Sequence, residues 1–115
     1  MRTPDFVIGQ GDLLEPLVVV IRDSQRTPVN LTGRQVVFQM RRLNGTTLVI
    51  AEAAMPDPDQ TAHPGLVRYY WQDGDTDVAG DYYADFLVTV GGESPATYPN
   101  DDSRKLYIRV SQKLA

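Results

Sequence analysis

The chain has 115 residues, of which 42% are hydrophobic and 23% charged, and its 15 acidic and 11 basic side chains give a net charge of -4. This length suits one domain with one core, over residues 1–115, and the composition excludes a wholly disordered or collagen-like chain. No run of basic residues interleaves with aromatics, which argues against nucleic acid as a partner. The absence of cysteine excludes disulfides, thiolate metal sites and a cysteine nucleophile.

The first half of the chain alternates apolar and polar residues, as half-buried strands do. The pattern predicts a short strand at residues 6–8 and another at 17–21. Residues 1–10 allow two interpretations: an arm, in its shortest form residues 1–5, that adds a strand to a neighbour's sheet, or a strand that completes the chain's own sheet. The N-terminus lacks a basic region before an apolar run, and the longest apolar run falls far short of the roughly 20 residues of a membrane helix, so neither a standard secretion signal nor a membrane span is expected.

The clearest alternation of apolar and polar residues lies at residues 35–41. Val36, Phe38 and Met40 face one way while polar residues face the other, which predicts a strand with Phe38 in the core. Residues 47–51 predict a weaker strand. Residues 48–55 could instead form a short helix, but the run is shorter than most stable helices and leads straight into Pro-Asp-Pro-Asp, so a strand with a frayed end is the preferred interpretation.

Three more strands are expected in the second half, separated by clusters of Gly, Pro, Asn and Asp that are typical of turns. Their inward residues are Val67, Tyr69 and Trp71, then Tyr82, Ala84, Phe86, Val88 and Val90, and then Leu106, Ile108 and Val110. Trp71 and Phe86 are therefore expected in the core. About seven short strands predict an all-β fold, an Ig-like antiparallel β-sandwich.

Asp73, Asp75 and Asp77 alternate as cation ligands often do. A helix-loop-helix calcium loop counted from Asp73 would need Gly at the sixth position and a bidentate carboxylate at the twelfth. Those positions hold Val78 and Ala84, so the preferred interpretation is a turn between two strands, with no metal.

Tyr82 stands just after this turn, at the start of a strand. The stretch "AGDYYADF" resembles the tyrosine corner of Ig-like domains, in which the hydroxyl bonds back to the upstream backbone. Antibody domains have a cysteine two positions later, where this chain has Ala84. The core is therefore expected to close by packing alone.

Tyr70, Tyr83 and Tyr107 fall on the outward faces of their predicted strands. Tyrosine combines a large apolar area with a polar tip and is enriched at protein interfaces, although single exposed aromatics are also common. These three residues are the candidate partner contacts. A register error of one residue would turn them inward.

No combination of residues predicts catalysis. His63 is the only histidine, and with no cysteine and no paired serine motif it builds neither a triad nor a histidine-rich metal site. Gly9 and Gly11 precede a strand and no GK[ST] follows, which does not fit a phosphate loop. We therefore expect no enzyme activity and no cofactor.

Three stretches together resemble a known family: "FVIGQGDLLEPLVVVIRDSQRTPVNLTGRQVVFQMR", "HPGLVRYYWQDGDTDVAGDYYADFLVT" and "TYPND". They are similar to the N-terminal domain of tailed-phage baseplate upper proteins and to related small Ig-like domains of phage structural proteins. The resemblance implies a non-enzymatic β-sandwich, assembled in the host cytoplasm and present in several symmetric copies on the virion, where other virion proteins are its partners.

Baseplate upper proteins continue into coiled-coil and partner-holding regions, whereas this sequence ends at Ala115. A stand-alone domain of this kind could decorate the capsid or lie at the neck, tail or baseplate. The alternative function, suggested by the outward tyrosines and the aspartate turn, is a carbohydrate- or calcium-binding adhesion module.

Overall fold

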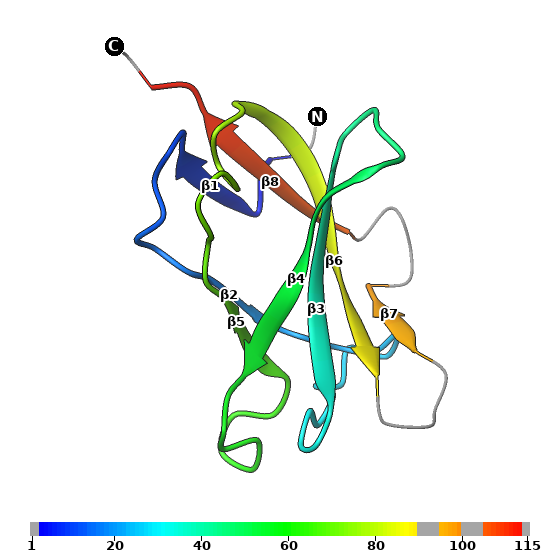
Figure 1. The fold of residues 1–115 in the computed structure, drawn as a ribbon. Coiled ribbons are helices and arrows are strands. Elements are labelled where there is room, and N and C mark those ends of the chain that lie inside the picture. Colours follow the sequence, from blue (N-terminus) through cyan, green and yellow to red (C-terminus); the bar gives the residue numbers. More distant parts are fainter. Residues whose placement is uncertain (1–2, 90–94, 100–104, 114–115) are drawn as a thin grey trace.

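The computed structural model describes residues 3–89, 95–99 and 105–113. These residues form eight strands and no helix (Figure 1), so none of them belongs to a helix that could span a membrane. The strands are β1 (Phe6–Gly9), β2 (Leu17–Val20), β3 (Gln35–Arg42), β4 (Leu48–Pro56), β5 (Leu66–Tyr69), β6 (Gly80–Thr89), β7 (Ala96–Tyr98) and β8 (Leu106–Ser111). The predicted all-β class is confirmed.

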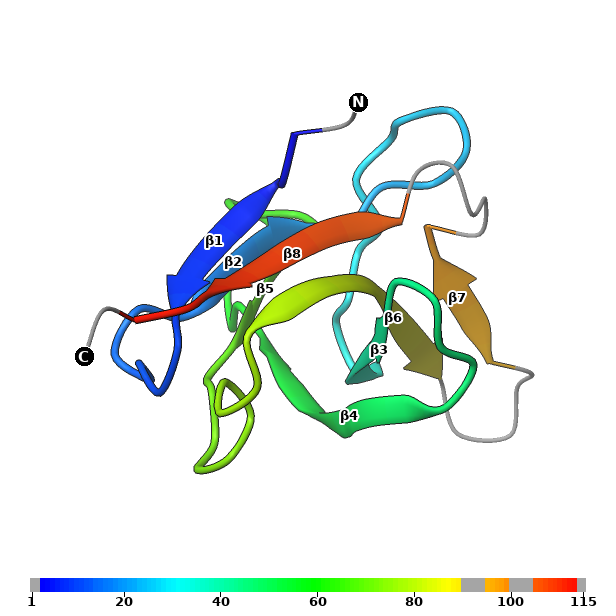
Figure 2. The same cartoon turned by 90° about the horizontal axis from the view of Figure 1, so that it is seen from above.

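The strands form two packed layers that share β4. The larger layer has the order β1-β8-β6-β3-β4, with β7 also paired to β6, and the smaller layer contains β5 and β2. β4 pairs with β3 along most of its length and then crosses to β5, where Met55 lies opposite Arg68 and Pro56 opposite Val67. Seen from above, this crossing curves the sheet nearly into a barrel (Figure 2).

The strand inventory differs from the sequence prediction in three respects. β7 is an additional strand within a stretch whose Gly and Pro content predicted only a turn. β4 is a strand of nine residues, which confirms the preferred strand interpretation but extends it well beyond the predicted residues 47–51, and the helical alternative is wrong. β1 pairs with β8 in parallel, which corrects the purely antiparallel expectation.

The pairing of β1 with β8 also decides between the two interpretations of the N-terminal segment. β1 completes the chain's own sheet, and the Asp5 amide just before it donates to the Tyr107 carbonyl oxygen at 2.7 Å. Any arm is therefore limited to the residues before Asp5, of which residues 1 and 2 lie outside the described part of the chain. Val90, the predicted end of the Tyr82 strand, also lies outside it.

Aromatic side chains from both layers meet in the core. The Phe38 ring stacks on Tyr69 with centroids 4.5 Å apart, and it contacts Phe86 at 5.5 Å and Trp71 at 5.9 Å. All four side chains are buried. The predicted inward positions of Phe38, Phe86 and Trp71 are confirmed, and the core closes without a disulfide because aromatic volume fills the space between the layers.

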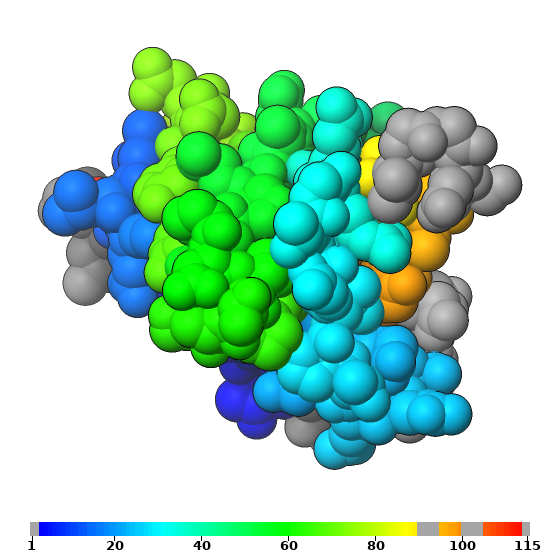
Figure 3. All heavy atoms as spheres, turned by 90° about the horizontal axis from the view of Figure 1, so that it is seen from below, coloured from blue at the N-terminus to red at the C-terminus, as the bar shows by residue number. Residues whose placement is uncertain are grey.

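A buried glutamine joins two loops at one end of the fold. Gln60 Oε1 accepts hydrogen bonds from the backbone amides of Leu31 at 3.1 Å and Gly65 at 2.8 Å, and its Nε2 donates to the carbonyl oxygens of Asp57 and Leu66. The side-chain amide of Gln60 thus makes four hydrogen bonds, which fills its two acceptor and two donor positions. Buried polar groups are ordinarily hydrogen-bonded in this way. Figure 3 shows the two loops, cyan and green, lying side by side.

Candidate functional site

The aspartate turn is the segment between β5 and β6 that contains Asp73, Asp75 and Asp77. It is held together by its own side chains and by contacts with the N-terminal segment. The Tyr69 hydroxyl donates to Asp75 Oδ2 at 2.5 Å, and the Gln72 backbone amide donates to the same oxygen at 2.8 Å. Burial, together with the hydrogen bond to Asp75, raises the pKa of Tyr69 above its ordinary value. Asp75 therefore serves as the anchor between the turn and a core tyrosine.

Two further contacts tie the turn to the loop after β1. The Thr76 hydroxyl, which is fully buried, donates to the Asp12 carbonyl oxygen at 3.0 Å. Gln10 Nε2 donates to the Asp77 carbonyl oxygen at 2.8 Å. Within the described ranges, no group of three or more His, Cys, Asp or Glu side chains could hold a metal ion.

Tyr82 occupies the position that the tyrosine-corner interpretation predicts. Its ring is buried, and its hydroxyl donates to the Val78 carbonyl oxygen at 2.6 Å, four residues upstream. Arg42 Nη1 donates to the same hydroxyl at 3.3 Å, and the guanidinium lies over the ring. The corner thus fastens the aspartate turn to the start of β6.

The three tyrosines proposed as partner contacts have different environments. Tyr70, just after β5, is 48% exposed. Tyr83 is half-buried, and its ring makes an edge contact with Tyr107, directly opposite on β8, at 6.5 Å. Arg41 lies over the Tyr83 ring. Of the three, Tyr70 is the one that is exposed.

The expectation for Tyr107 needs correction. The residue does point to the outer face, as predicted, but it is only 8% exposed. Its ring is covered because Tyr83 packs against it and the Arg109 guanidinium lies over it, with Nη2 donating to the Tyr107 hydroxyl at 2.8 Å. Arg109 also donates a hydrogen bond to Asp81 at 2.9 Å, which holds the guanidinium in place over the Tyr107 ring. The same bond lowers the pKa of the Asp81 carboxyl.

An open sheet edge, which sequence reasoning did not identify, runs along β4. Residues 48–54 pair with β3 on one side, and no described strand pairs with their other side. Leu48, Val49 and Met55 on this strand are 44%, 52% and 61% exposed. The signal in the sequence was the stretch "LVIAEAAM", which is mostly apolar and carries a single charge, Glu52.

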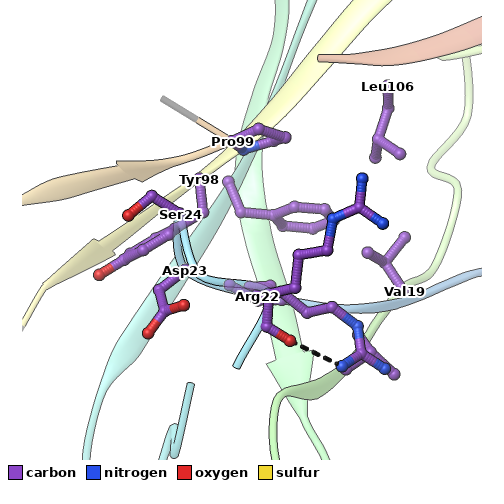
Figure 4. Close-up of a pocket in the computed structure, with 11 residues that line it drawn as sticks. Val19, Arg22, Asp23, Ser24, Tyr98, Pro99 and Leu106 are labelled. Carbon is purple, nitrogen blue, oxygen red and sulfur yellow. Dashed lines mark hydrogen bonds between the residues drawn. The ribbon is translucent and has the colours of Figure 1, made fainter. Parts of the chain in front are cut away.

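A cavity of about 270 Å³ opens between the two layers (Figure 4). Its apolar lining comes from the segment around β2 and from β6, β7 and β8, and includes Val19, Ile21, Phe86, Tyr98 and Leu106. Val19 and Leu106 lie across the cavity from Tyr98 and Pro99. Two exposed arginines, Arg22 and Arg26, also line it, and Arg22 Nη1 donates to the Arg26 carbonyl oxygen at 3.1 Å.

Neither a protein-family model nor a curated protein matches this chain.

Proposed function

We propose that this protein is a non-enzymatic structural component of a tailed-phage virion, attached to the baseplate, tail, neck or capsid and bound there to neighbouring virion proteins. Two lines of support combine. The resemblance of the chain to small Ig-like phage domains supports the virion location. The open edge of β4 supports the binding of a neighbouring protein, and it is the observation on which the proposal depends.

The β4 edge has the properties of a strand that accepts another strand. An unpaired edge presents backbone N–H and C=O groups, and an extended segment of a partner satisfies them by adding a strand to the sheet. Along residues 48–54, Glu52 supplies the one charge, and the outward side chains of Val49, Ala51 and Ala53 are small and apolar. Glu52 lies opposite Phe38, and its charge is the feature of residues 48–54 that an incoming strand has to accommodate.

Tyr70 extends the same surface. β5 leaves the pairing with β4 after Arg68, and Tyr70 follows directly with about half of its surface exposed. A partner strand along β4 would meet this ring, which provides a large apolar area with a polar tip. Tyr70 is thus the candidate tyrosine best placed for contact, whereas Tyr83 and Tyr107 mainly pack against each other.

The adhesion alternative finds no specific support in the described residues. The Asp75 carboxylate, which a calcium site would need, is already bonded to Tyr69 and Gln72. A thermal melt with calcium or with glycans tests this alternative, and a rise in melting temperature would favour it.

The proposal is tested on purified particles of a phage that encodes this chain. Particles are banded by density, and the chain is quantified by mass spectrometry relative to the major capsid protein. A fixed stoichiometry through successive purification steps supports a virion component. Loss of the chain during purification would contradict the proposal and would favour an adhesion or host-modifying role.

A further inference from the structure

From the cavity between β2 and β6–β8 we infer a second binding site, which takes a large apolar side chain flanked by carboxylates in an extended segment of a partner protein. The inference rests on the proposed function in one respect, namely that the occupant belongs to a neighbouring protein. It adds a site, separate from the β4 edge, and a defined ligand chemistry.

The size and lining of the cavity indicate the apolar part of the ligand. Sites for drug-sized molecules span about 300–1,000 Å³, and this cavity of about 270 Å³ is better suited to one large side chain. Phe86 is buried in the core, while Tyr98 and Leu106 are partly buried and retain surface toward the cavity. An inserted apolar side chain would remove this surface from water, which is the main favourable contribution to such binding.

The charges around the cavity indicate the anionic part. The polar side of the cavity is formed by Arg22, Asp23, Ser24 and Arg26, so two arginines and one carboxylate line it on a protein whose net charge is -4. Neither guanidinium forms an ion pair with a described carboxylate. Asp23, the acidic residue beside them, accepts hydrogen bonds from the amides of Gln25 and Thr27. The two arginines are therefore available to carboxylates of a ligand, which guanidinium groups bind with paired hydrogen bonds.

The backbone of Arg26 gives an independent reason to assign a role to its side chain. Its φ is 65°, and it is the one non-glycine residue with positive φ among those described. It closes the turn between Asp23 and Thr27, in which the Arg26 amide donates to the Asp23 carbonyl oxygen at 2.9 Å. Glycine is the ordinary residue at such a left-handed position, and a long side chain there costs conformational free energy. An observed strain of this kind points to a functional side chain.

The binding test uses the full chain and a blocked peptide with one phenylalanine between two aspartates. Two control peptides replace the aspartates by asparagine or the phenylalanine by alanine. We expect saturable amide shifts in NMR spectra, centred on Val20, Ile21 and Leu106, and at least tenfold weaker binding of both control peptides. Shifts centred elsewhere, equal binding of the asparagine peptide, or no binding at millimolar peptide would each overturn the inference.

The decisive variant is Arg26→Gly, because it should weaken binding of the peptide without lowering the stability of the protein. Glycine relieves the positive φ, so the melting temperature should stay the same or rise, while the acidic peptide should bind at least tenfold more weakly. Arg34→Gln, which removes a positive charge away from the cavity, is the control and should bind the peptide as the parent does. Unchanged binding in Arg26→Gly would overturn the inference.

The peptide assay and the particle assay can fail independently. If the chain belongs to the particle but the peptide does not bind, the cavity site is wrong and the proposed function stands. If the peptide binds as described but the chain is absent from particles, the cavity site stands and the virion role is wrong.

Discussion

The hydroxyl of Tyr82 donates a hydrogen bond of 2.6 Å to the carbonyl oxygen of Val78. This bond joins the end of the aspartate turn to the beginning of β6, the strand that pairs with β3, β7 and β8. The bond is partly buried, because the Tyr82 ring lies in the core while Val78 is exposed, and deleting the hydroxyl leaves the Val78 carbonyl oxygen without this donor.

The Tyr82→Phe variant tests the strength of this corner. We expect the free energy of unfolding to fall by about 1–2 kcal/mol, because the Val78 carbonyl oxygen loses its donor and Arg42 loses an acceptor. Urea denaturation followed by fluorescence measures the change. Tyr70→Phe removes the same atom from an exposed ring, and its effect should stay within about 0.5 kcal/mol. Equal effects of the two variants would show that the corner bond does not contribute.

The bond from Tyr69 to Asp75 predicts a specific pH dependence. Burial and this bond raise the pKa of Tyr69 above the ordinary value of 10.0, so the folded state keeps its proton to higher pH than the unfolded state does. The stability from the protonated hydroxyl is complete below pH 10 and is lost as the pH rises from there toward the folded-state pKa.

Tyr69→Phe should remove this component. Above pH 10 the unfolding free energy of the parent protein should fall more steeply than that of the variant, by up to about 1.4 kcal/mol per pH unit, which corresponds to one proton. Denaturation at a series of pH values from neutral to alkaline gives both curves. Parallel curves of unfolding free energy against pH would mean that the pKa of Tyr69 is the same in the folded and the unfolded protein.

Gln60 is predicted to be the most sensitive polar residue of the loops. Gln60→Leu keeps the approximate volume but leaves the amides of Leu31 and Gly65 without their acceptor, and we expect a loss of about 2–4 kcal/mol. Gln25→Leu, at an exposed turn position, is the control. A loss below about 0.5 kcal/mol for Gln60→Leu would show that water replaces the amide at this site.

The β4 edge predicts a variant that folds but assembles poorly. Ala51→Lys places a charge on the exposed side of the strand, so the stability of the isolated protein should change by no more than about 0.5 kcal/mol. The charge should prevent strand addition and reduce incorporation into particles by at least tenfold, measured by complementation and mass spectrometry. Leu14→Lys, a charge on an exposed loop leucine, should leave incorporation unchanged. Normal incorporation of Ala51→Lys would exclude this edge as the contact.

The alternation of apolar and polar residues was sufficient to predict the core, and a local sequence pattern was sufficient to predict the tyrosine corner. The alternation around Phe38 and Phe86 predicts which side chains face inward, because one buried face specifies the register of a strand. Tyr82 was identifiable because its position after a Gly-containing turn is a local pattern. These features depend on residues close together in the chain, and the structure confirms them.

The features that escaped prediction depend on residues far apart in the sequence. The cover over Tyr107 requires Tyr83 from another strand, and the parallel pairing of β1 with β8 joins the two ends of the described chain. The cavity likewise brings Val19 together with Leu106. Alternation gives the face of a side chain but not its neighbours, so Tyr107 was assigned the correct face and the wrong exposure.

The measurement that tests the central claim most directly is a cryo-EM map of the purified phage particle at a resolution that separates strands. We predict density for this chain at symmetric positions, with a strand of a neighbouring virion protein paired along residues 48–54 of β4 and in contact with Tyr70. A particle without this chain would contradict the virion role. A particle in which the chain is present but solvent covers the β4 edge would contradict the proposed mode of binding.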